Sequence, residues 1–130
     1  MSIYITSPVS DADHPEPVHV QPGGTTGYIC AWGNLKIGPK TNAKVYAKVY
    51  AAGDTPPDNP PPGATSVDPQ GNNWKFFMIP NVKASTAASY PANKLKIWAT
   101  YEGVNTPDSK EVTFYGKTAD KTRCEGPGTT

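Results

Sequence analysis

The sequence predicts an all-β protein, a sandwich of seven to eight short antiparallel strands in one domain. Apolar and polar residues alternate with a period of two in several short stretches, and no stretch shows the period of a long helix. Proline (15) and glycine (12) supply 27 of the 130 residues and mostly fall between those stretches, where they indicate turns. Short strands with turns between them are typical of two packed sheets, and 130 residues is an ordinary length for one domain.

Each strand is predicted from such an alternation. In chain order, the predicted strands are residues 2–6, 18–20, 25–35, 43–52, 65–67, 73–79, 94–102 and 110–115. In the first of them Ile3 and Ile5 share one side and Tyr4 takes the other. The third follows a Pro-Gly-Gly turn and is rich in aromatic and β-branched residues, which strands prefer.

The clearest strand is residues 43–52, which read Ala-Lys-Val-Tyr-Ala-Lys-Val-Tyr-Ala-Ala. Val45, Ala47 and Val49 share one side, and lysines and tyrosines share the other. A helix would scatter the valines around its surface, so the pattern favours a strand.

The core is predicted from the more apolar side of each strand. In residues 73–79 we assign Trp74, Phe76 and Met78 to that side. The predicted core residues are Ile3, Ile5, Ile29, Ala31, Val45, Ala47, Val49, Trp74, Phe76, Met78, Leu95, Ile97, Ala99, Val112 and Phe114.

Three segments are predicted to lie outside the strands. Residues 53–63 contain five prolines, which cannot donate ladder hydrogen bonds, so we expect an exposed loop of polyproline character. Pro80 is expected to end its strand, and the polar, alanine-rich residues 81–93 to hold one helical turn. The sandwich domain is expected over residues 1–116, and residues 117–130 form a polar tail that frays.

The two cysteines, Cys30 and Cys124, leave two alternatives. They can form a disulfide, which suits an oxidising compartment, or they can be one buried thiol and one thiol in the polar tail. If they pair, the long loop that they close contributes about 4–5 kcal/mol of stability in the chain-entropy model.

The charge and the apolar runs exclude some partners. The net charge of +1 gives no long-range attraction to nucleic acid, so we expect no nucleic-acid partner. No apolar run approaches the 18 or so residues needed to span a bilayer, so no direct membrane insertion is expected. The N-terminus lacks the pattern of a signal peptide. We expect an extracellular or cell-surface location if the chain is part of a larger protein with neighbouring domains, and a cytoplasmic location stays open.

Four segments resemble the bacterial immunoglobulin-like (Ig-like) domains that occur in large surface and secreted proteins. They are the opening Ile-Thr-Ser-Pro of residues 5–8, Cys-Ala-Trp-Gly of residues 30–33, the run from Gly71 to Pro80 around Trp74, and residues 95–101. The resemblance covers the chain from about Ile3 to Tyr115.

This resemblance implies an immunoglobulin-like β-sandwich that serves as a spacer or adhesive module, without catalytic residues. The chain departs from the family pattern in two places. Residues 102–105 read Glu-Gly-Val-Asn where family members often carry an aspartate and then Gly-Asn, and residues 55–62 form an unusual proline-rich insertion.

One sheet face is the candidate binding site. In such a sandwich the third strand and the last two lie in one sheet, so the outward side chains of residues 43–52, 94–102 and 110–115 are expected to meet. The candidate aromatic and basic face consists of Tyr46, Lys48, Tyr50, Lys96, Trp98 and Tyr115. Exposed rings can stack on sugars or anchor a protein, but cross-strand aromatic pairs also simply stabilise sheets. If the face binds a ligand, replacing Trp98 and Tyr46 by alanine abolishes binding and leaves the melting temperature nearly unchanged.

No motif demands an active site, so we expect no enzyme and no cofactor. The chain has no Gly-x-Ser-x-Gly motif and no phosphate-binding glycine loop. Its acidic loop residues and its two histidines lack the spacing of metal ligands, so no metal site is expected. The predicted function is a non-catalytic structural or adhesion module of a larger cell-surface or secreted protein. The alternatives are a carbohydrate-binding module that uses the aromatic face, and a structural subunit of a virion or appendage.

Overall fold

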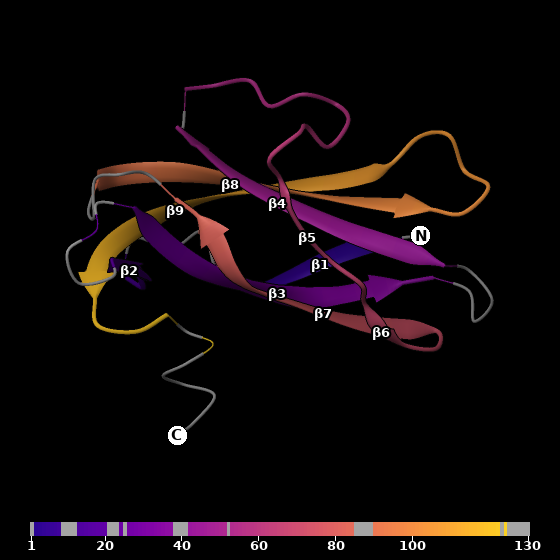
Figure 1. Ribbon diagram of the computed structural model, residues 1–130, viewed down its shortest axis with the longest axis horizontal. Coiled ribbons are helices and arrows are strands. Elements are labelled where there is room, and N and C mark those ends of the chain that lie inside the picture. The colour runs from indigo at the N-terminus through magenta and orange to yellow at the C-terminus, as the bar shows by residue number, and fades with distance from the viewer. Residues whose placement is uncertain are drawn as a thin grey trace.

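A computed structural model describes residues 2–8, 13–20, 24, 26–37, 42–51, 53–84, 90–122 and 124, and the regular secondary structure within these residues is all strand. The prediction of an all-β protein is confirmed (Figure 1). The nine strands of the described residues are β1 (Ser2–Ser7), β2 (Glu16–Val20), β3 (Gly27–Lys36), β4 (Ala43–Ala51), β5 (Thr65–Val67), β6 (Gln70–Gly71), β7 (Trp74–Lys83), β8 (Tyr90–Tyr101) and β9 (Asp108–Ala119).

The strands form one mixed sheet that curls into a half-barrel. Its order is β5-β4-β8-β9-β2-β3-β7-β6, and β1 pairs with β3 beside this path. The two ends of the path come together, because β7 also contacts β4 and β5. The pairs are antiparallel except β2 and β9, which run parallel from Glu16↔Gly116 to His19↔Ala119. The expectation of purely antiparallel strands is therefore wrong for this pair.

The inner surface of the curled sheet forms the hydrophobic core. Of the predicted core residues, nine are buried: Ile3, Ile29, Ala31, Val45, Ala47, Leu95, Ile97, Ala99 and Phe114. Ile5, Val49 and Val112 are partly buried and pack against this core. In these strands one side is clearly more apolar than the other, so alternation alone identifies the inner side.

The prediction for β7 is wrong. Trp74, Phe76 and Met78 are 51%, 44% and 46% exposed, while Phe77 and Ile79 are buried. Both sides of this strand are apolar, so the alternation does not say which side faces inward. The register with β3 decides it, because Phe77 pairs with Gly33 and Ile79 pairs with Ala31.

The strand β7 also continues past Pro80, which was expected to end it. Ile79 pairs with Ala31 and Val82 pairs with Ile29, so two residues of β7 stand opposite Cys30 alone. This is a β-bulge, a place where a strand tolerates proline because the ladder is locally interrupted. The predicted helical turn in residues 81–93 is replaced by strand at both ends, and residues 85–89 lie outside the described residues.

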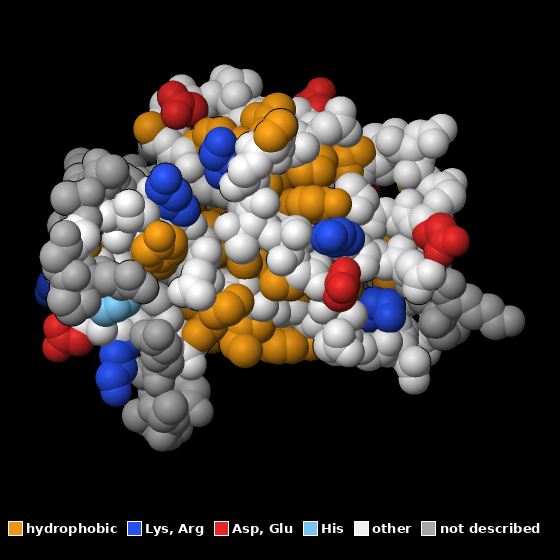
Figure 2. Space-filling model, viewed as in Figure 1, with side chains coloured by type: hydrophobic (Ala, Val, Ile, Leu, Met, Phe, Trp, Pro, Cys, Tyr) orange, Lys and Arg blue, Asp and Glu red, His pale blue; other side chains and the backbone are white. Residues whose placement is uncertain are grey.

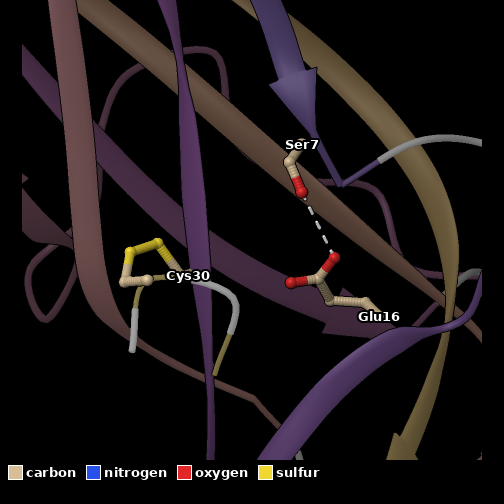
Figure 3. The surroundings of a disulfide bond; sticks show 4 residues. Ser7, Glu16 and Cys30 are labelled. Carbon is tan, nitrogen blue, oxygen red and sulfur yellow. Dashed lines mark hydrogen bonds between the residues drawn. A yellow bond between two sulfur atoms is a disulfide. The ribbon is translucent and has the colours of Figure 1, made fainter. Parts of the chain in front are cut away.

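The C-terminal part is more ordered than the expected tail. Strand β9 extends to Ala119, three residues beyond the predicted domain boundary, because residues 117–119 pair with β2. Farther on, Cys124 forms a disulfide with Cys30 of β3, with their Cα atoms 5.6 Å apart (Figure 3). Of the two alternatives for the cysteines, the structure has the bonded one. The rest of the predicted tail, residue 123 and residues 125–130, lies outside the described residues.

A buried polar contact joins β1 to β2 near the disulfide. The Ser7 hydroxyl donates a hydrogen bond of 3.4 Å to the carboxylate of Glu16, and both residues are buried (Figure 3). The contact ties together two strands that pair with different parts of β3, β1 with residues 32–36 and β2 with residues 27–28.

Candidate functional site

The structure brings most of the predicted binding face together. Strand β4 lies between β5 and β8, and its register with β8 pairs Tyr46 with Trp98 and Lys48 with Lys96. Strand β9 lies on the other side of β8, as expected. Tyr115 stands apart, because Trp98 pairs with Ser109, and six residues of strand correspond to about 20 Å.

The expectation that Trp98 and Lys96 stand exposed on this face is wrong. Trp98 is 0% exposed, and Lys96 is buried as well. The proline-rich loop between β4 and β5 covers them, and in Figure 1 it arches beside β8 at the top of the view. The backbone carbonyl of Pro57 accepts hydrogen bonds from Trp98 Nε1 at 3.2 Å and from Lys96 Nζ at 2.8 Å.

The lysines beneath this loop have their charges compensated locally. Lys94 Nζ donates to the carbonyl of Asp54 at 3.2 Å. The carboxylate of Glu111 lies 3.7 Å from Lys94 Nζ and 3.8 Å from Lys96 Nζ. Lys96 Nζ also lies 5.4 Å from the centre of the Trp98 ring, within cation–π range. These groups are therefore engaged with one another and with the loop.

Of the remaining residues of the predicted face, the three on β4 are only partly accessible. Tyr46, Lys48 and Tyr50 are half-buried, and Lys48 Nζ lies 5.5 Å from the centre of the Tyr50 ring. Burial raises the pKa of the Tyr50 hydroxyl above its ordinary value. Tyr115 is exposed. A glycan cannot stack on Trp98, the central ring of this face, because the loop already occupies the surface over it.

A second aromatic surface lies on the outer side of β1, β3 and β7, and the sequence interpretation missed it. We call it the β1–β3–β7 face. Its residues are Tyr4, Trp32, Asn34, Lys36, Trp74, Phe76 and Met78. The strand register makes them neighbours: Asn34 pairs with both Tyr4 and Phe76, and β7 places Trp74 beside Lys36 and Met78 beside Trp32.

The rings of the β1–β3–β7 face contact one another and carry lysines over them. The Tyr4 and Trp74 ring centres are 5.4 Å apart with an interplanar angle of 44°. Lys36 Nζ lies 5.6 Å from the centre of the Trp74 ring, and Lys110 Nζ of β9 lies 5.7 Å from that of Tyr4. Figure 2 shows hydrophobic side chains gathered along β3 and β7 at the lower edge of the view.

The sequence did contain a signal for this surface. In residues 74–79 five of the six side chains are apolar, and a strand at the surface of a single domain presents only one side to the core. Either the Trp74 side or the Phe77 side therefore had to face outward. Both choices leave at least one aromatic ring exposed, and an exposed aromatic ring is a candidate for contact with a partner.

Among the described residues, no three His, Cys, Asp or Glu side chains lie together as a metal site would require. A polar hollow of about 400 Å³ lies between the proline-rich loop and the β8–β9 turn. It is lined by Asp58, Asn59, Asn105, Thr106, Pro107 and Ser109. These amides, hydroxyls and one carboxylate can form hydrogen bonds.

Comparison with protein-family models, with curated proteins and with solved structures finds no match to this chain. Within the part of the chain that the structure describes, no helix has the length and apolar character needed to cross a membrane.

Proposed function

We propose that the chain is a non-catalytic structural and adhesion module with an Ig-like sandwich fold, part of a larger cell-surface or secreted protein. The strand order supports the fold, because the curled sheet divides into two groups that can pack face to face. One group is β5-β4-β8-β9-β2, and the other is β1-β3-β7-β6. Among the described residues, two register pairs, His19↔Tyr28 and Val20↔Gly27, connect them.

The main support for a structural role is that a strand near each end of the chain is held in the same parallel pair. Strand β2, near the N-terminus, and β9, near the C-terminus, lie side by side and parallel. Tension between the ends therefore pulls these strands in opposite directions along their length, and four residue pairs resist together. Such shear loads all the ladder hydrogen bonds at once, whereas peeling breaks them one after another.

The disulfide gives a second shear contact. Because Cys124 is bonded to Cys30, tension on the C-terminal side reaches β3 directly. The force on the N-terminal side acts at Ser2 of β1. Ser2 pairs with Lys36, which lies at the opposite end of β3 from Cys30. Strands β1 and β3 are therefore also pulled past each other. The cysteines are 94 residues apart in the sequence, and the disulfide keeps the chain between them closed as a loop under load.

The same bond supports the proposed location. Disulfides form and persist in oxidising compartments, and they are rare in reducing ones. The disulfide joins β3, in the β1-β3-β7-β6 group, to the C-terminal segment. Such a bond suits a module of an extracellular or cell-surface protein.

The test is single-molecule stretching of the whole chain by handles at its two ends. With the disulfide intact, only residues 2–30 can extend, which is about 100 Å at about 3.5 Å per residue. With the disulfide reduced, residues 2–124 extend, to about 430 Å by the same rise.

The matched control attaches the handles at residues 2 and 36, which are register partners, so that β1 peels from β3. We expect the end-to-end geometry to withstand a clearly higher force than the peeling geometry. Equal forces in the two geometries would contradict the structural role.

A further inference from the structure

The β1–β3–β7 face has the composition of a docking surface. The described part of the chain has six exposed large hydrophobic side chains, and four of them lie here: Tyr4, Trp74, Phe76 and Met78. Aromatic residues and methionine are enriched in protein interfaces, and contiguous exposed apolar patches mark sites of interaction. Lysines border the patch, and only Asn34 at its centre offers a neutral amide.

The charge of this face is of one sign. Strands β1, β3 and β7 contain no aspartate and no glutamate, and Lys36 of β3 stands on this face beside Trp74. Lys110 of β9 adds a second cation beside Tyr4. Two copies of the face would bring like charges together, so the surface disfavours pairing with itself and favours a partner that carries carboxylates.

The same molecule shows what covers a tryptophan–lysine surface of this kind. On β8 the loop over Trp98 and Lys96 is a proline-rich segment, and one of its carbonyls, that of Pro57, accepts hydrogen bonds from both side chains. The Lys96–Trp98 contact of 5.4 Å is closely similar to the Lys36–Trp74 contact of 5.6 Å. The covering loop also carries Asp54 and Asp58. The face on β8 is closed by the chain itself, and the face on β3 and β7 is open.

We propose that the β1–β3–β7 face binds an extended, proline-rich, acidic segment of a partner protein. Its prolines pack on the rings of Tyr4, Trp74 and Phe76, since prolines in the polyproline conformation dock on aromatic side chains with little loss of entropy. Its backbone carbonyls accept hydrogen bonds from Trp74 Nε1 and Lys36 Nζ. Its carboxylates approach Lys36 and Lys110. This docking site stands on its own contacts and does not depend on the mechanical role proposed above.

A protein segment fits the surface better than a glycan. A sugar chain presents hydroxyl groups along its edges, and these need polar partners beside the stacking ring. Phe76 and Met78 offer no hydrogen-bonding group that could serve them, apart from the weakly accepting thioether sulfur. Proline rings have no such hydroxyls, and their backbone carbonyls match the donors at Trp74 and Lys36.

The first experiment titrates the whole chain with a peptide of the covering loop, residues 54–63, which reads Asp-Thr-Pro-Pro-Asp-Asn-Pro-Pro-Pro-Gly. Binding is followed by NMR through the indole N–H signal of Trp74, which the Trp74→Phe variant identifies. We expect saturable shifts at Trp74 and along β1, β3 and β7. A control peptide with alanine at every proline is expected to bind at least ten-fold more weakly.

Variants of the chain locate the binding. Trp74→Ala and Lys36→Glu are each expected to weaken binding ten-fold or more. If Trp74→Ala perturbs the fold, Lys36→Glu still tests the site. Tyr115→Ala, an exposed aromatic residue on β9, is the matched control and is expected to leave binding unchanged.

Three results would overturn the proposal. The first is the absence of any shift on β1, β3 and β7 at millimolar peptide. The second is a response at Trp74 to neutral or acidic oligosaccharides without one to the peptide, which assigns the face to glycans. The third is concentration-dependent self-association that Trp74→Ala abolishes, which assigns it to a second copy of the chain.

Discussion

Gly33 shows how the absence of one side chain organises three strands. It lies in β3 between Ile5 of β1 and Phe77 of β7, and it is buried. A Cβ atom at this position would overlap the backbone carbonyl oxygen of Tyr4 and would lie 3.0 Å from the Phe77 ring. The missing side chain therefore lets β1 approach β3 and lets the Phe77 ring turn inward.

We predict that Gly33→Ala destabilises the fold by about 1–3 kcal/mol, the usual cost of overpacking a core. The carbonyl oxygen of Tyr4 belongs to the backbone, so it can make room only if β1 moves away from β3. Urea unfolding measures the change, with Gly53→Ala as the control, because a Cβ atom there meets nothing within 4 Å. Equal stabilities of the two variants would contradict this account of the packing.

Tyr101 makes stability depend on pH at the alkaline end. It is 4% exposed, and burial raises the pKa of its hydroxyl above the ordinary value of 10; the neighbouring carboxylate of Asp108 raises it further. Above pH 10 the unfolded chain releases this proton and the folded chain retains it. The free energy of unfolding therefore falls as the pH rises, with a slope of up to about 1.4 kcal/mol per pH unit from this group.

We predict that Tyr101→Phe removes this contribution to the slope. The free energies of unfolding of both proteins, measured by chemical denaturation between pH 8 and pH 11, should diverge only above pH 10. A variant that loses stability with pH as steeply as the parent chain would show that another group is responsible.

At the scale of elements, the proline-rich loop and β8 act as one unit. The loop gives carbonyl acceptors to Trp98, Lys96 and Lys94, and it converts an aromatic strand surface into a buried layer. The five prolines of this loop suit its position, because proline needs no partner for a ladder hydrogen bond and has a restricted backbone. The loop thus acts as a cover for the β4–β8 surface.

We predict that Trp98→Ala costs about 3–5 kcal/mol, as expected for truncating a buried tryptophan. This reverses the sequence-based expectation that Trp98 and Tyr46 could be truncated with little change in melting temperature. Tyr115→Ala is the matched control on the neighbouring strand, and we expect its stability to stay within about 0.5 kcal/mol of the parent. Equal melting temperatures of the Trp98→Ala variant and the parent chain would show that the loop does not pack on this ring.

At the scale of the whole molecule, the disulfide holds the C-terminal segment on β3. Its two cysteines are 94 residues apart, and closing so long a loop restricts the unfolded chain strongly. The bond joins the N-terminal and C-terminal parts of the fold, beside the parallel pair of β2 and β9.

We predict that reduction, or the paired substitution of Cys30 and Cys124 by alanine, lowers the free energy of unfolding by about 4–5 kcal/mol in the chain-entropy model. Urea unfolding with and without reductant measures it, and the alanine variant should no longer respond to reductant. An unchanged urea midpoint on reduction would mean that the bond does not stabilise the fold.

The sequence by itself determined the strands and most of the core. Where one side of a strand is clearly more apolar, as with Val45 and Ala47 of β4 or Leu95 and Ile97 of β8, the period of two identifies the inner side. These are local properties, because alternation follows from the geometry of a single extended chain. The resemblance to Ig-like domains stays a proposal about how those strands pack.

Only the tertiary structure decided which aromatic rings reach the surface. The orientation of β7 depends on its register with β3 and on the space at Gly33, and the burial of Trp98 depends on a loop about 40 residues earlier in the chain. Such long-range contacts leave no mark in the alternation of a single strand. The predicted binding face on β8 is therefore covered, and the open aromatic surface lies on β1, β3 and β7.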